Sequence, residues 1–217
     1  MKLKKISVFL LISAISLSTT LLKAQTKITE GLAVFALEFP TEGMDEQYKA
    51  MMPTESKIYF KGDKSRSEME MSIMTMVSIT DTKEKSLIML MDVMGKKTAM
   101  KTDLSKSKEG EKNYKVKVTD ETKTIAGYKC IKAVITDDDD IKFDIWFTKE
   151  IQGSTSGNMQ FKDIDGFLMS YEMPVPNIEG NMKMECKSVK AEKVSDDKFA
   201  IPGGYEIKTQ DELMNGK

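Results

Sequence analysis

The chain has 217 residues, with 33 basic and 34 acidic side chains and a formal net charge of −1, a length that suits one domain with its own core. The charges nearly cancel and Arg66 is the one arginine, which argues against a nucleic-acid partner, because phosphate contacts require clustered Lys and Arg. The sequence contains no histidine, which excludes serine triads, cysteine–histidine dyads and histidine-based zinc sites.

The N-terminus has the three parts of a secretory signal. Three lysines precede the apolar run Ile6–Leu17, and the small residue Ala24 follows it. The run is shorter than the ~20 residues that cross a bilayer as a helix. We therefore expect a signal peptide at residues 1–24, cleavage before Gln25, and a soluble periplasmic domain at residues 25–217 with no stable membrane span.

The rest of the chain alternates apolar and polar residues with a period of two, and turn-forming residues separate the alternating segments. This pattern predicts a mainly β domain with an antiparallel sheet. The expected strands are Gly31–Phe39, Glu55–Lys61, Lys64–Met71, Thr75–Thr80, Lys85–Met91, Lys97–Lys101, Tyr114–Thr119, Thr122–Ile125, Lys129–Thr136, Ile141–Thr148, Gly166–Glu172, Met182–Val194 and Tyr205–Lys208.

Helical signals are few. One short helix is expected over Met44–Met52, where Pro53 ends it, and the polar stretch Thr102–Asn113 is either a loop or a second helix. The alternation changes phase once, near Ser72–Met74, which predicts a tight turn or a bulge there.

Residues for catalysis are not singled out by any spacing. The carboxylates are scattered, and Gly203-Gly204 lacks the lysine and the helix of a phosphate-binding loop. We expect a non-catalytic protein with no cofactor and no conventional metal site.

Two cysteines, Cys130 and Cys186, lie inside expected strands. In an oxidising compartment an even pair favours a disulfide, which would stabilise the fold by ~4 kcal/mol if the geometry allows it. Two buried free thiols that pack as small apolar residues are an equally weighted alternative.

Methionine is abundant, with 18 residues, and it recurs in pairs two positions apart, which share one face of a strand. Such a flexible, polarisable face adapts to hydrophobic ligands, and we take these pairs as the candidate ligand-binding face. The alternatives are that they fill the core, or that their thioethers bind Cu(I). The pairs are Met69/Met71, Met74/Met76, Met89/Met91 and Met182/Met184.

Four segments resemble an uncharacterised family of exported proteins from Gram-negative bacteria. They are Thr124–Cys130 (Thr-Ile-Ala-Gly-Tyr-Lys-Cys), Ile141–Ile151 (Ile-Lys-Phe-Asp-Ile-Trp-Phe-Thr-Lys-Glu-Ile), Ile58–Arg66 and Phe199–Tyr205. That family is similar in pattern to periplasmic lipoprotein carriers of the LolA and LolB type. The resemblance implies a curved, half-barrel-like antiparallel sheet with one or two short helices, able to hold an acyl chain.

Our leading hypothesis is therefore a periplasmic binding protein for a lipid, a lipoprotein acyl chain or another hydrophobic ligand. Trp146 is a candidate contact aromatic at the mouth of such a site, although a tryptophan packed under a loop is the more common case. The alternative class is a structural domain that binds an envelope protein and no small ligand.

Overall fold

A computed structural model describes residues 27–105, 114–138, 140–155, 157–161, 163–174 and 180–208. The expected signal peptide and most of the polar stretch after Asp103 lie outside these ranges. The strands are β1 (Glu30–Glu38), β2 (Glu55–Lys61), β3 (Lys64–Met71), β4 (Met74–Asp81), β5 (Ser86–Val93), β6 (Lys96–Asp103), β7 (Lys115–Ile125), β8 (Tyr128–Thr136), β9 (Lys142–Thr148), β10 (Phe167–Pro174), β11 (Asn181–Ala191) and β12 (Glu206–Lys208).

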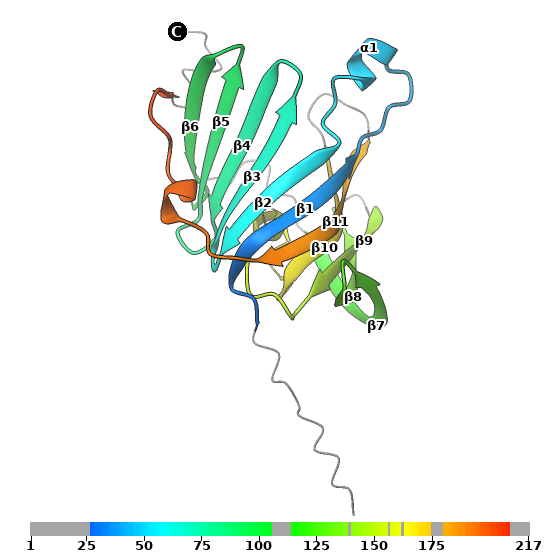
Figure 1. Cartoon of the computed structure of the whole chain (residues 1–217). Coiled ribbons are helices and arrows are strands. Elements are labelled where there is room, and N and C mark those ends of the chain that lie inside the picture. The colour runs from blue at the N-terminus through cyan, green and yellow to red at the C-terminus, as the bar shows by residue number, and fades with distance from the viewer. Residues whose placement is uncertain are drawn as a thin grey trace, which may run out of the picture.

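All these strands form one sheet, in the order β12-β6-β5-β4-β3-β2-β1-β11-β10-β9-β8-β7. Every neighbouring pair is antiparallel except β12 and β6, which are parallel. The sheet is curved and does not close into a barrel, so the expected fold class is confirmed (Figure 1). We call β3–β6 the arm, because these strands form one flank of the sheet, while β7–β9 form the other.

The expected strands match the observed ones to within three residues at each end, with one exception, and the bounds of β2 and β3 match without any offset. Tyr114–Thr119 and Thr122–Ile125 are not two strands, because β7 runs through both and shifts its register against β8 between Val118 and Thr122. A bulge of this kind interrupts the alternation without ending the strand, which is why the sequence suggested a break.

Helices are shorter than expected. The helix α1 covers Glu46–Lys49 only, and Asp45 caps it by accepting a hydrogen bond from the Gln47 backbone N–H at 2.8 Å. Two more single turns, α2 (Gly157–Gln160) and the 3₁₀ turn η1 (Asp196–Phe199), were not predicted.

The main core lies on the face of the sheet that carries Phe35 and Phe60, which we call the inner face. The ring centroids of Phe60 on β2 and Phe167 on β10 are 4.9 Å apart, although β1 and β11 lie between these strands. Three strand spacings would separate them by ~14 Å in a flat sheet. The sheet is therefore bent strongly around this core, with the inner face concave.

The outer face of the arm has a core of its own. Val77, Ile79, Leu90 and Ala99 are buried there under Phe199, Ile201 and Tyr205 of the C-terminal segment. We call residues 196–205 the strap. Arg66 contacts the strap through its Nη1, which donates a hydrogen bond to the Lys198 carbonyl at 3.1 Å. The Nε of the same guanidinium pairs with the Glu68 carboxylate at 2.6 Å.

Candidate functional site

The methionines of β3 and β4 face the same side of the sheet. Ser72 and Ile73 form a two-residue turn, so Met69 lies opposite Met76 and Met71 lies opposite Met74. Directly opposed residues of an antiparallel pair point to the same face. The phase change in the sequence is thus the hairpin turn, and it brings both pairs onto the inner face.

The next two strands extend this surface. Met91 on β5 lies opposite Met76, and Met89 lies opposite Met100 on β6. Sequence reasoning missed Met100, since it has no methionine two positions away, although its alternation with Thr98 and Thr102 placed it on one face of a strand. We call the combined surface the methionine face; it consists of Met69, Met71, Met74, Met76, Met89, Met91 and Met100.

These methionines are half-buried rather than buried. Within the part of the chain that the structure describes, Met69 packs against the main core and the other six belong to neither core cluster. The inner side of the arm is thus less covered than its outer side, where the strap packs.

Hydroxyl groups also lie on the inner face, with Ser65 and Thr80 near the β2–β3 turn and Ser56 directly opposite Met69. Ser56 and Ser67 share a hydrogen bond of 2.8 Å, and Ser65 and Thr80 share one of 2.5 Å. All four residues are buried. Their hydroxyl groups satisfy one another, and the methionine thioethers lie beside them on the same face.

The end of the arm away from the β2–β3 turn is an apolar tip. Ile73, Val93 and Met94 are 52%, 40% and 85% exposed, and the Met94 backbone N–H donates to the Ile73 carbonyl at 3.2 Å. Val93 lies opposite Met74, so the tip continues the methionine face. Met94 also has a φ of +52°, which is uncommon for a residue with a side chain.

The fourth predicted pair lies elsewhere. Met182 and Met184 on β11 are buried in the main core, where Met184 lies between Leu37 and Tyr171 in register. The structure therefore brings together six of the eight predicted methionines and places the other two among the packed residues of the core.

Trp146 is on the outer face of β9, since its neighbours Ile145 and Phe147 point into the core. The Lys123 ammonium lies 4.4 Å from the centre of its ring. This cation–π contact, and the position on the opposite side of the sheet, separate Trp146 from the methionine face.

Cys130 on β8 and Cys186 on β11 are buried free thiols. Burial raises the pKa of Cys130 to about 11 and that of Cys186 to about 12. Each thiol donates weakly to a nearby backbone carbonyl, Tyr128 for Cys130 and Ser188 for Cys186, both at 3.4 Å. Both thiols are therefore neutral at pH 7 and poor nucleophiles; a disulfide between them stays a prediction.

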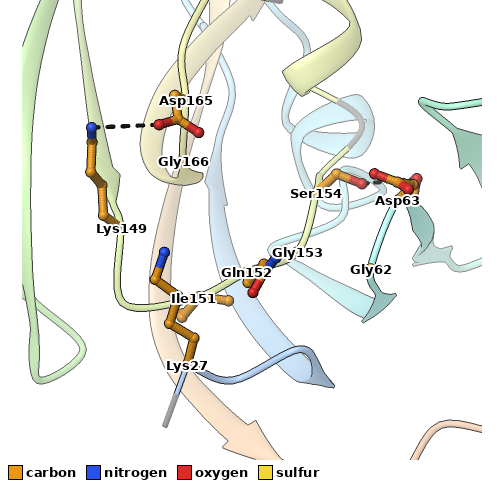
Figure 2. A pocket seen from close by; sticks show the side chains of 10 residues that line it. All are labelled: Lys27, Gly62, Asp63, Lys149, Ile151, Gln152, Gly153, Ser154, Asp165 and Gly166. Carbon is orange, nitrogen blue, oxygen red and sulfur yellow. Dashed lines mark hydrogen bonds and ion pairs between the residues drawn. The ribbon is translucent and has the colours of Figure 1, made fainter. Parts of the chain in front are cut away.

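A polar pocket of about 290 Å³ lies beside the β2–β3 turn, at the far end of the arm from the apolar tip (Figure 2). Lys149 pairs with Asp165 at 3.5 Å, and the Ser154 hydroxyl donates to the Asp63 carbonyl at 3.1 Å. Two lysines and two aspartates line the pocket, so no net charge selects a ligand.

Two glycines of this pocket are explained by the core beneath it. A Cβ on Gly153 would lie 2.5 Å from the Phe60 ring, and one on Gly166 would lie 2.5 Å from the Phe147 ring. The pocket thus marks where the segment after β9 presses onto the core phenylalanines.

Among the described residues no three His, Cys, Asp or Glu side chains gather as metal ligands. No helix in the described ranges is long and apolar enough to span a bilayer.

These features define a class: a mainly β protein built on one curved, open sheet, with methionines gathered on the inner face of one flank. Within it, the chain belongs to the family described as domain of unknown function DUF4412, which matches residues 44–163, more than half of the sequence. The match confirms the resemblance to an uncharacterised family. Among curated proteins, none matches this chain.

Proposed function

We propose that this protein is exported through a cleaved signal peptide and binds an acyl chain or a similar hydrophobic ligand in the periplasm, without catalysis. The observation that supports this proposal is the methionine face, where thioether side chains from four strands lie side by side and half-buried on a concave surface. Unbranched methionine side chains adapt to ligands of varied shape.

The lipoprotein-carrier relationship belongs to this proposal. A curved, open sheet is the property that the resemblance to the LolA and LolB carriers implied, and it supports a related role. The described helices have four residues each, so an acyl chain on the inner face would contact the side chains of the sheet directly. If half of a sixteen-carbon chain were buried, the gross gain would be ~6 kcal/mol at ~0.8 kcal/mol per methylene, which suits reversible binding.

The first test is native mass spectrometry of the protein purified from its host. We expect an added mass that dissociates as a fatty acid or a lipid. The second test is titration of the purified protein with a fluorescent fatty acid, comparing the native protein with the double variant Met76→Gln/Met91→Gln. Two amides in the centre of the face must be desolvated by the ligand, so we expect affinity to fall by about tenfold or more.

Ile141→Gln is the matched control, because Ile141 is exposed in the turn between β8 and β9, on the other flank. It should bind as the native protein does. A bare mass together with no fatty-acid binding by the native protein would refute the proposal and favour the alternative class, a protein-interaction domain with no small ligand.

A further inference from the structure

We propose that Met69, Met76 and Met91 bind one soft monovalent cation, Cu(I), through their three thioether sulfurs. This inference does not depend on acyl binding, because it uses the sulfur atoms rather than the apolar surface.

The register places these three residues in one row across three neighbouring strands. Met76 lies directly opposite Met69 on one side and directly opposite Met91 on the other. Directly opposed Cβ atoms lie about 4.5–5.5 Å apart. Because each methionine side chain has three rotatable bonds, the sulfurs of Met69 and Met91 can reach toward an ion above Met76.

The three residues of this row offer uncharged, soft thioether donors, and the row continues past Met91 through Thr98 on β6 to Glu206 on β12. Thr75 points to the outer face, because its neighbours on β4, Met74 and Met76, point to the inner face. Glu70 and Asp92 lie directly opposite Thr75, so their carboxylates are on the outer face as well. Thioethers select Cu(I), whereas Ca²⁺ and Mg²⁺ require oxygen ligands and Zn²⁺ favours imidazole, thiolate or carboxylate. With no histidine in the sequence, the row favours Cu(I) over the divalent cations.

Neighbouring sulfurs extend the site. Met74 and Met89 are each two positions from a row member on the same strand and face, so they lie next to the row. A change of rotamer at Met74 or Met89 could therefore bring another thioether to an ion bound at Met76. Met182 and Met184, in contrast, are buried in the core at the centre of the sheet.

The test is an anaerobic titration in which the protein, without its signal peptide, competes with a colorimetric chelator for Cu(I). We expect one equivalent of Cu(I) to be withdrawn from the chelator. The triple variant M69L/M76L/M91L should bind Cu(I) at least about tenfold more weakly, since all three sulfurs are lost. Met94→Leu, in the exposed turn of the apolar tip, is the matched control and should leave the affinity unchanged.

Leucine preserves the size and apolar character of the face, so the same triple variant should still bind the fluorescent fatty acid, which separates this inference from the proposed function. As a second readout, Ag(I) added to protein labelled with ¹³C at the methionine methyl groups should shift the resonances of Met69, Met76 and Met91 and leave those of Met182 and Met184 in place. No competition by the native protein, equal affinity in the triple variant, or shifts confined to other methionines would each overturn the assignment.

Discussion

Cys130 and Cys186 show how burial controls the chemistry of single residues in this protein. Their folded-state pKa values of about 11 and about 12 exceed the ordinary thiol value of about 8.5. Below pH ~8.5 both thiols stay protonated in the folded and in the unfolded chain, so their full contribution to the free energy of unfolding is present. Above that pH the unfolded chain releases them first, so the free energy of unfolding falls.

We therefore predict that the reduced protein loses stability from pH about 8.5 upward, until the pH passes the folded-state values of about 11 and about 12. Urea unfolding at a series of pH values, in the presence of a reductant, measures this decline. The double variant Cys130→Ala/Cys186→Ala keeps the alkaline titration of lysines and tyrosines, so it should show a shallower decline. Identical slopes for the two proteins would contradict the assignment.

The site residues that could be predicted from the sequence were those with regular spacing. The two-residue spacing of Met69/Met71, Met74/Met76 and Met89/Met91 was sufficient to find most of the methionine face. The same spacing in Met182/Met184 gave no sign that β11 lies in the centre of the sheet, where its inner face packs into the main core. Spacing reports which side chains share a strand face, whereas burial depends on what packs against that face.

At the scale of elements, the strap is the part of the fold that covers the outer face of the arm. Phe199, Ile201 and Tyr205 pack on the second core cluster, and the contacts of Arg66 to Lys198 and of Lys61 to Asp196, at 2.8 Å, hold the strap at its start. Lys198 also lies over the Tyr59 ring at 4.0 Å.

We predict that Phe199→Ala lowers the free energy of unfolding by ~2 kcal/mol, because it removes a half-buried aromatic ring from this cluster. Chemical denaturation monitored by circular dichroism measures the change. Lys193→Ala, at an exposed position before the strap, should alter stability by less than ~0.5 kcal/mol. A stable Phe199 variant would show that the strap is dispensable for the arm.

Elements that alternate strongly were predicted well, and short helical turns were not. In α2, Asn158 accepts hydrogen bonds from the Thr155 backbone N–H and hydroxyl and donates to the Gly166 carbonyl at 2.9 Å. Phe161 and Ile164 then insert into the core. Such a turn is held by tertiary contacts, and four residues are too few for a helical period to show in the sequence.

At the scale of the whole molecule, the order of strands places the family-defining segment on both flanks of the sheet. Residues 44–163 include β2–β6 on one side and β7–β9 on the other, while β1, β11 and β10 lie between them. The pairing of β1 with β11 joins residues some 150 positions apart in the chain, and no local pattern encodes such a pairing.

We predict that residues 44–163 alone do not form the native sheet. The fragment lacks three central strands, exposes the inner faces of β2 and β9, and leaves both flanks with open edges. Gel filtration and circular dichroism of this fragment should show aggregation or loss of cooperative unfolding, whereas residues 27–208 should unfold cooperatively. A monomeric, cooperative fragment would mean that the two flanks fold without the centre.

The central position of β1 also has a consequence for the order of assembly during synthesis. Strands β1–β6 are each adjacent to the next in both sequence and sheet, so they can form a meander as soon as residue 103 is available. The second neighbour of β1 is delivered only with residues 181–191. Until then, the edge of β1 that later pairs with β11 has unpaired backbone N–H and C=O groups. If nascent chains associate prematurely, we expect a strand from another copy to pair with this edge.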